Sequence, residues 1–422
     1  MNHIGVCVVS GNVRRTAEIA FGDANDPSYV CLKDYAQHPE RAAYGWTSNN
    51  SVFATLGMDY APICHQIVQN GEPGFAWLQN MQEYSRMDGV PDHRDARAAG
   101  GNPCLEQTLE SYELCCLVET FPANHSTLDE YKETLRYAPL KARFSGTAAV
   151  MTMSFHLPRC RGLHELKDWC TQGYAAIQAY DKTYSDFLAI PRSIKTTRCD
   201  ASMASFGWLR LIRVSYSIKP SGTVSLLAGA TPGMHYPESR FYIRRVRLDR
   251  ASELLPALVA AGYAAVTRRC GEFTGIWRRY QVEPAAEAPN ETLVVSIPVD
   301  VGENVRTLAQ LSAWEQLSLA SFLQRYWADN QVSCTIAFDP VLEGSQLEHA
   351  LAYFQYQLKG VSLLPKVPQG AYAQMPYEEI SEATYRTMVA ALSPVSFRGI
   401  RSRGGPVEVP DRFCDTSSCE TK

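Results

Sequence analysis

The sequence predicts an α/β protein with parallel strand pairing, of the kind that closes into a barrel. Strand-like and helix-like segments alternate along residues 293–364, which favours a parallel sheet covered by helices. The 422 residues are 45% hydrophobic and 20% charged, as is usual for a folded globular protein. No apolar run approaches the roughly 20 residues that span a bilayer, so no membrane-spanning helix is expected.

Charge and cysteine content narrow the class further. Lys plus Arg number 40 and Asp plus Glu 44, which gives a net charge of −4 with no basic block and argues against nucleic-acid binding. The 13 cysteines are too few for a disulfide scaffold, and the N-terminus carries no signal-peptide pattern. The His residues show no metal-ligand spacing. We expect a reduced cytoplasmic protein without a bound metal, whose cysteines are mostly buried thiols.

The hydrophobic pattern predicts the elements of the first part of the chain. Residues 4–9 form an apolar run that we interpret as a buried strand. Apolar residues at steps of three and four predict an amphipathic helix over residues 163–184, which ends before Pro191. Ser252 is a candidate cap for a further helix that stops at Gly262.

The clearest alternation begins at residue 293. A capping box at Ser312 and Glu315 predicts the start of its first helix. The predicted order is strand 293–297, helix 313–327, strand 332–338, helix 347–358 and strand 361–364. From residue 401 the chain is rich in Gly, Pro, Ser and charge, and we expect a mobile tail there.

The most informative stretch is residues 100–120, with the sequence GGNPCLEQTLESYELCCLVET. Its glycines and Pro103 predict a turn that presents Cys104 between Asn102 and Glu106. In extended backbone, residues two apart point the same way, so an amide, a thiol and a carboxylate are expected to face one substrate. Taken singly, each cysteine here is better explained as an ordinary buried thiol next to a Gly-Pro turn.

Three further features are candidate sites. Cys115 is expected to lie on the opposite face of the following strand from Cys116. The turn Ser221, Gly222 and Thr223 offers backbone N–H groups and hydroxyls that suit a phosphate, although Ser-Gly-Thr alone is more often a plain turn. The tail carries a cysteine pair, Cys414 and Cys419, whose spacing differs from that of common zinc knuckles. A zinc half-site and exposed thiols without a function are the alternative interpretations of this pair.

Taken whole, these motifs resemble a known family. Asn-Pro-Cys-x-Glu followed by Glu-Leu-Cys-Cys-Leu-Val-Glu-Thr-Phe-Pro resembles the active-site loop of adenosylcobalamin-dependent (class II) ribonucleoside-triphosphate reductases. Residues 12–20 and 45–51 are similar to upstream barrel segments of that family, and residues 219–237 to its substrate-phosphate loop. Residues 326–334, with the sequence YWADNQVSC, and the tail cysteines complete the match.

The resemblance implies a fold, an activity and a set of roles. The fold is part of a ten-stranded α/β barrel with a central cysteine-bearing finger loop over residues 1–400, followed by a flexible redox tail over 401–422. The activity is the reduction of ribonucleoside triphosphates by thiyl-radical chemistry, with adenosylcobalamin as cofactor and thioredoxin as reductant. The implied roles are the thiyl radical for Cys104, the general base for Glu106, substrate orientation for Asn102, a reducing thiol for Cys115, phosphate binding for Ser221, Gly222 and Thr223, and a disulfide shuttle for Cys414 and Cys419.

The sequence also departs from the family pattern. Family members extend further at the N-terminus, where the resemblance places the second reducing cysteine, and residues 141–161 and 198–215 are atypical. Two alternatives therefore stay open: one half of a split reductase that acts with a separate N-terminal chain, and a catalytically inactive remnant. The two reducing thiols must be close enough to form a disulfide, with Cα atoms within about 7 Å. Cys115 is one of them, and the resemblance places its partner in the N-terminal part of the family. We therefore expect no turnover by this chain alone.

Overall fold

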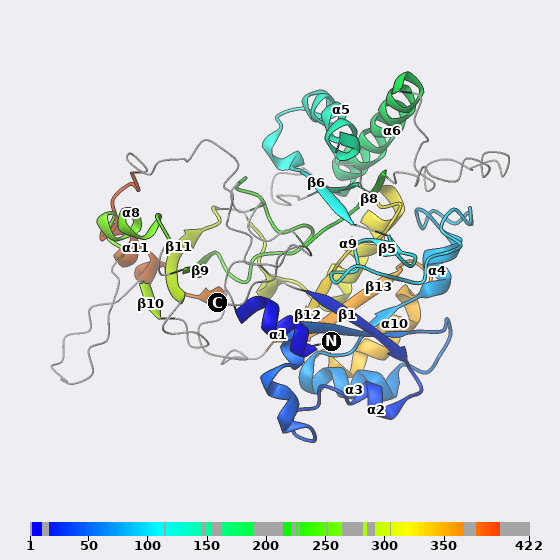
Figure 1. Cartoon of the computed structure of the whole chain (residues 1–422), viewed down its shortest axis with the longest axis horizontal. Helices are drawn as coiled ribbons and strands as arrows, with labels where there is room; N and C mark the ends of the chain where they lie inside the picture. Colours follow the sequence, from blue (N-terminus) through cyan, green and yellow to red (C-terminus); the bar gives the residue numbers. More distant parts are fainter. Residues whose placement is uncertain are drawn as a thin grey trace, which may run out of the picture. The chain divides into compact units, whose positions relative to one another are not determined.

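The computed structural model describes residues 2–10, 17–113, 115–144, 149–153, 162–188, 214–220, 225, 228–249, 252–263, 282–284, 292–303, 305–366 and 377–396 (Figure 1). The chain divides into two compact units. The first contains Met1–Arg240 and Val301–Ala371, and the second contains Phe241–Asp300 and Tyr372–Lys422. Over the described residues, none of the helices combines the length and the apolar character that crossing a membrane requires.

A five-stranded sheet forms the first part of the larger unit. Its order is β1 (Glu18–Asp23), β2 (Ser48–Phe53), β3 (Gly74–Ala76), β13 (Gly360–Pro365) and β12 (Thr335–Phe338). The first three strands are parallel to one another, and so are the last two. The two sets meet where β13 pairs with β3 in the antiparallel sense.

A three-stranded parallel sheet continues this arrangement. It consists of β6 (Cys116–Thr120), β7 (Ala149–Met153) and β8 (Val214–Ser217). A parallel bridge from Ile218 to Val332 connects its last strand with the segment that leads into β12. The strands of this unit therefore follow one another in the order expected of an open part of an α/β barrel, which confirms the predicted fold class. Strand β7 lies within the atypical region 141–161, and Val214 and Ser215, the last residues of the region 198–215, pair with it.

Helices cover these sheets and bury a core rich in aromatic residues. They are α3 (Ala61–Asn70), α5 (Leu128–Phe144), α6 (Leu163–Leu188), α9 (Ala313–Tyr326) and α10 (Leu347–Phe354). The largest fully buried side chains of the unit are Trp77, Trp327, Tyr131, Tyr216, Phe75 and Phe338. The predicted capping box opens α9: Ser312 Oγ accepts from Glu315 N at 3.2 Å, and Glu315 Oε2 accepts from Ser312 N at 3.2 Å.

The prediction for residues 4–9 is wrong. They belong to a helix, α1 (Asn2–Ser10), and Ile4 is 59% exposed. A short apolar run does not distinguish a strand from a helix by its period, and here it forms no ladder. Instead, Asn2 Nδ2 donates to Ser48 Oγ at 2.9 Å and to the carbonyl of Tyr44 at 3.2 Å, which ties the helix to the start of β2.

The smaller unit is antiparallel, which the alternation of elements did not predict. Its sheet has the order β10 (Val282–Pro284), β11 (Thr292–Asp300), β9 (Phe241–Asp249) and β14 (Tyr377–Glu379). All three pairings are antiparallel. The predicted strand 293–297 therefore exists within β11 but belongs to this sheet. Helices α8 (Leu255–Ala260) and α11 (Glu382–Ala390) accompany it, and α8 ends before Gly262 as predicted. The prediction of Ser252 as its cap is wrong, because α8 begins after Leu254 and has no side-chain cap.

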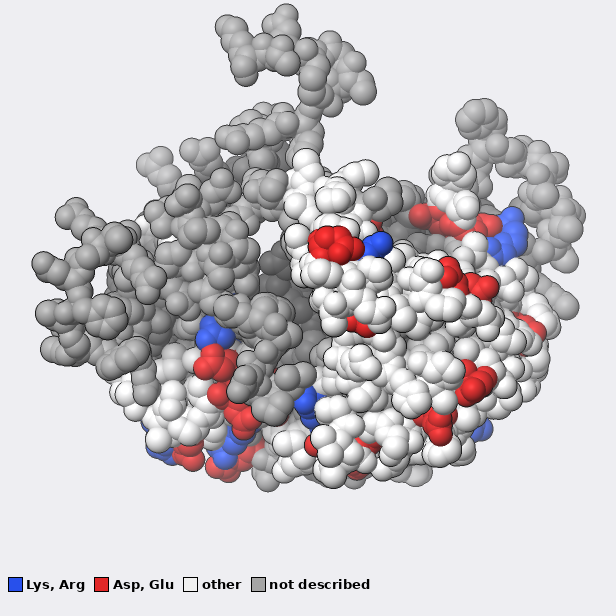
Figure 2. Space-filling view, turned by 90° about the horizontal axis from the view of Figure 1, so that it is seen from below, with Lys and Arg blue, Asp and Glu red and all other residues white. Residues whose placement is uncertain are grey.

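One face of the molecule carries mixed charge. Figure 2 shows scattered acidic groups with a few basic ones among them on the described part of that face. The absence of nucleic-acid binding stays a prediction.

Candidate functional site

The candidate site is built on a short hairpin. Strand β4 (Gly100–Gly101) pairs with β5 (Thr108–Leu109) in the antiparallel sense, and residues 102–107 connect them. We call residues 102–107 the finger loop. A Cβ atom on Gly101 would lie 2.6 Å from Leu105 Cδ1 and 2.8 Å from the carbonyl oxygen of Gln107. Glycine is therefore needed where the loop folds back on its own base.

The finger loop is turned rather than extended, so the predicted alternation of side chains is wrong. Asn102 organises the turn, because its Oδ1 accepts from Gln107 N at 2.9 Å and its carbonyl accepts from Leu105 N at 2.7 Å. Leu105 adopts a φ of 55°, in the left-handed region. As a result the loop separates its functional groups by exposure: the Cys104 side chain is exposed, whereas Glu106 is only 1% exposed.

Glu106 is the buried acid of the site. Burial raises the pKa of its carboxyl group, and so does the charge of Glu119, whereas the hydrogen bond from Asn102 and the charge of Lys219 lower it. Its Oε2 has no hydrogen-bond partner among the described residues. A buried oxygen of this kind is a site where a bound hydroxyl group can donate a hydrogen bond.

The Cys104 thiol lies one residue before the left-handed Leu105. Although its side chain is open to solvent on one side, the protein atoms packed around it raise its pKa to about 11. The charge of Glu106 contributes to this increase, and Lys219 opposes it. The thiol is therefore protonated at neutral pH, and this is the form that can give up a hydrogen atom.

Asn102 also brings a second thiol into the site. Its Nδ2 lies 3.8 Å from Cys115 Sγ, and Cys115 is half-buried immediately before β6. The structure thus brings together the four residues predicted from the motif, although in a different backbone conformation. Whether Cys116 faces the opposite way stays a prediction, since its side chain lies outside the described residues.

Sequence reasoning missed an ion pair beside these groups. Lys219 Nζ lies 2.9 Å from Glu119 Oε1, and the two side chains are 23% and 8% exposed. Glu119 belongs to β6 and Lys219 follows β8, so the sheet joins residues that are far apart in sequence. The positions of the two residues in the sequence could have marked them as candidates. Glu119 lies in the motif of Cys115, and Lys219 immediately precedes Pro220 and the predicted phosphate turn.

Gly233 holds the backbone of Lys219 in place. It has a φ of 65°, and a Cβ atom there would lie 2.2 Å from the Lys219 carbonyl oxygen. We expect Gly233→Ala to destabilise the chain by about 1–3 kcal/mol more than Gly229→Ala, in line with overpacking elsewhere. Gly229 is a matched control, because it shares the φ of 65° but has no atom within 4 Å of the added Cβ. Urea unfolding measures both, and equal losses of stability would contradict the close approach.

The remaining predicted site residues lie outside the described residues. These are Ser221, Gly222, Thr223, Cys414 and Cys419. Within the described ranges, no three His, Cys, Asp or Glu side chains form a cluster that could hold a metal ion. The absence of a bound metal stays a prediction.

Comparisons with known proteins agree with this geometry. No family model matches the chain. It is 53% identical over 444 residues to a probable adenosylcobalamin-dependent ribonucleoside-triphosphate reductase of Dictyostelium discoideum, which covers 99% of this chain and 53% of that protein. The corresponding reductase of Euglena gracilis is 47% identical over 446 residues, with coverages of 99% and 55%.

A solved structure gives the same result. The chain resembles a crystal structure of B12-dependent (class II) ribonucleotide reductase with a TM-score of 0.71 and 29% identity, over 93% of this chain and 56% of that one. The barrel strands therefore have the arrangement of a ribonucleotide reductase. Over nearly its whole length the chain is similar to adenosylcobalamin-dependent ribonucleoside-triphosphate reductases. It spans about half the length of the curated relatives it matches.

Proposed function

We propose that this chain forms the catalytic part of a reductase that converts ribonucleoside triphosphates to 2′-deoxyribonucleoside triphosphates. One observation carries the proposal: a single turn holds the protonated thiol of Cys104, the buried carboxyl of Glu106 and an amide in contact with the Cys115 thiol. Because the chain spans about half the length of its relatives, the activity belongs to it together with the rest of the reductase. The retained site and the 53% identity favour this function over that of an inactive remnant.

The proposed chemistry gives each group one step. A thiyl radical on Cys104 removes the hydrogen atom from C3′ of the ribose, and Glu106 accepts the proton of the 3′-hydroxyl at its unpartnered Oε2. The 2′-hydroxyl then leaves as water with a proton from one reducing thiol, and C2′ takes the hydrogen of the other. Cys115 and a second thiol supply two electrons and become a disulfide, and the hydrogen atom returns from Cys104 to C3′. Asn102, fixed by the turn, orients the substrate hydroxyls.

The finger loop fits the proposed cofactor at one point. The Cys104 side chain is exposed, so a bulky group can approach its sulfur, while Glu106 is covered. When bound, adenosylcobalamin supplies the organic radical that takes the hydrogen atom from the Cys104 thiol. The raised pKa of Cys104 keeps that hydrogen atom in place at neutral pH.

The substrate triphosphate is proposed to bind at the turn Ser221, Gly222 and Thr223. This assignment rests on the resemblance of residues 219–237 to the phosphate loop of the family and on the chemistry of hydroxyls and backbone N–H groups. Lys219 adds a cation immediately before the turn, although its ammonium group already pairs with Glu119.

Thioredoxin is the proposed reductant, acting through Cys414 and Cys419. A tethered dithiol can reduce a buried disulfide because the tether gives it a high effective concentration. We expect the double Cys414→Ser, Cys419→Ser variant to lose turnover with thioredoxin and to keep it with a small dithiol such as dithiothreitol. The measurement is deoxynucleotide formation with each reductant. Equal rates with both reductants would remove the shuttle role.

We also propose that the protein works in the cytoplasm. Cys31, Cys64 and Cys334 are free thiols, as a reducing compartment would leave them. Cell fractionation tests this directly, and recovery in a secreted or organellar fraction would contradict it.

A further inference from the structure

The motif over residues 326–334 has no part in the proposed chemistry, yet it lies against the finger loop. It contains a run of buried polar residues between α9 and β12, and Asn330, Gln331 and Ser333 are 0%, 1% and 8% exposed. Buried polar groups destabilise a fold unless they are hydrogen-bonded, so the partners of this run indicate its purpose.

One set of bonds holds the finger loop. Ser333 Oγ donates to the carbonyl of Cys104 at 2.5 Å, directly at the residue that carries the thiol. At the base of the loop, Asn330 Oδ1 accepts from both the backbone N and the Oγ1 of Thr108, each at 2.8 Å. The loop is thus bound at its tip and at its C-terminal end by side chains of one short segment.

A second set of bonds holds the strand that leads to the phosphate turn. Asn330 N donates to the carbonyl of Tyr216 at 2.9 Å, Ile218 N donates to the carbonyl of Gln331 at 3.1 Å, and Ser333 N donates to the carbonyl of Ile218 at 2.9 Å. Ile218 immediately precedes Lys219. The backbone of residues 330–333 therefore fixes this strand end, while the side chains of Asn330 and Ser333 fix the loop.

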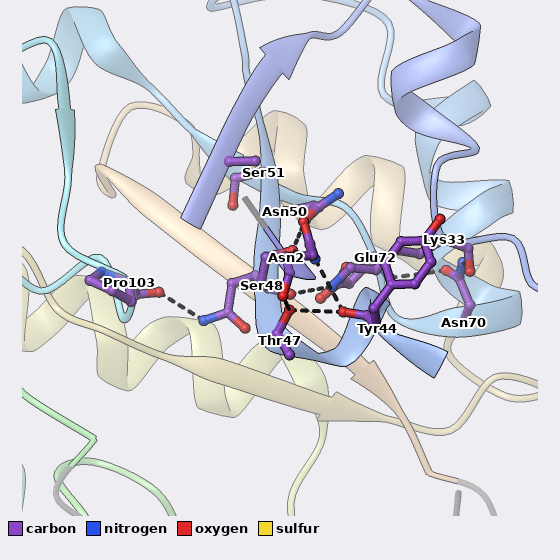
Figure 3. Close-up of polar contacts among 12 residues, drawn as sticks. Asn2, Lys33, Tyr44, Thr47, Ser48, Asn50, Ser51, Asn70, Glu72 and Pro103 are labelled. Atoms are coloured by element: carbon purple, nitrogen blue, oxygen red, sulfur yellow. Dashed lines mark hydrogen bonds and ion pairs between the residues drawn. The ribbon is translucent and has the colours of Figure 1, made fainter. Parts of the chain in front are cut away.

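Strand β2 supports the loop from another element. Asn49 Nδ2 donates to the carbonyl of Pro103 at 2.7 Å, next to the carbonyl held by Ser333. Strand β2 is itself anchored by Lys33, which donates to the carbonyl of Ser48 and pairs with Glu72 Oε2 at 2.6 Å (Figure 3). Two consecutive carbonyls of the loop are thus held by β2 and by the segment that precedes β12.

We propose that Asn330 and Ser333 are positioning residues that set the distance between the Cys104 thiol and the strand end at Ile218 and Lys219, and so between the thiol and the bound substrate. The proposal rests on the proposed function and adds two residues to it. Hydrogen abstraction needs reacting atoms about 3–3.5 Å apart, and a displacement of roughly 1 Å can lower the rate about a hundredfold. Because residues 330–333 bind both the loop and the strand end, they keep the two at a fixed distance and prevent such a displacement.

The test compares Ser333→Ala with Ser321→Ala. Ser321 is a matched control, because its Oγ also makes one hydrogen bond, to Gln357 Oε1 at 2.7 Å, but on α9 away from the loop. We expect Ser333→Ala to lower kcat about tenfold with KM changed less than twofold, and to speed hydrogen–deuterium exchange over residues 102–113. Ser321→Ala should change neither. Asn330→Ala should act like Ser333→Ala with a larger effect, and Ser333→Thr should restore kcat by restoring the hydroxyl.

The outcomes separate this inference from the function on which it rests. Wild-type kcat and wild-type exchange in Ser333→Ala, with an inactive Cys104→Ser variant, would overturn the positioning role alone. A loss of thermal stability without a change in kcat would show that Ser333 is merely structural, and would also overturn it. An active Cys104→Ser variant would refute the proposed function, while the exchange rates would still test the contact between Ser333 and the loop.

Discussion

Replacing Cys104 with serine is expected to reduce deoxynucleotide formation to the background of the assay. The O–H bond of serine is stronger than the S–H bond of cysteine, so the hydroxyl does not yield a hydrogen atom to the radical source. The substitution is close to isosteric on an exposed side chain, so folding should be unaffected. Chromatography of the products from labelled ribonucleoside triphosphate measures the effect in the reductase that contains this chain.

The control for this experiment is Cys31→Ser. Cys31 is also a free, partly accessible thiol, but it lies outside the finger loop. It should keep wild-type turnover, which excludes a general effect of losing one thiol. Persistent turnover in Cys104→Ser would refute the assignment of the radical site.

The second large effect is expected from Glu106→Gln. The amide keeps the shape and the polar contacts of the side chain but cannot accept a proton, so kcat should fall by about 10²–10⁴ while KM changes little. Steady-state kinetics with varied substrate separate the two constants. Parallel losses in kcat and in substrate affinity would show that Glu106 only binds the substrate.

The pH dependence follows from the same carboxyl group. Burial raises the pKa of Glu106 above its usual 4.5, and the carboxylate is the form that acts as a base. Activity should therefore rise with pH through this raised value. Lys219→Met removes a cation that lowers the pKa, so the rise should move to higher pH. Lys182→Met is the control, since Lys182 pairs with Asp186 on the exposed surface of α6.

The raised pKa of Glu106 makes stability fall with increasing pH, whereas it makes activity rise. A raised pKa in the folded state means that folding favours the protonated carboxyl, so the contribution of Glu106 to stability is present below its ordinary pKa and is lost as the pH rises through the raised value. The pH range in which Glu106 is an effective base is thus one in which its burial destabilises the fold.

Sequence reasoning succeeded where structure is set locally. The capping box at Ser312 depends on residues three apart, and the helix formed as predicted. The prediction for residues 4–9 failed because a short apolar run has no period that separates a strand from a helix, and the segment forms a helix that Asn2 ties to Ser48. The antiparallel sheet of the second unit was missed because alternation of element types does not specify pairing partners.

The site shows the same limit. The motif identified Asn102, Cys104 and Glu106, but the bond from Gln107 N to the Asn102 side chain bends the loop, and no periodicity encodes it. The pair of Lys219 and Glu119 forms only because β6, β7 and β8 lie in one sheet. The positions of Glu119 and Lys219 within two motifs marked both residues as candidates, but no local pattern in the sequence indicates that they form a pair.

The bridge between Ile218 and Val332 has a consequence for how this chain tolerates change in length. The register of the strand end before Lys219 is held by backbone bonds to residues 330–333. One residue added between Ile218 and Pro220 would leave these bonds in place but would move Lys219 away from Glu119. The length of the chain is therefore tightly constrained between Ile218 and Pro220.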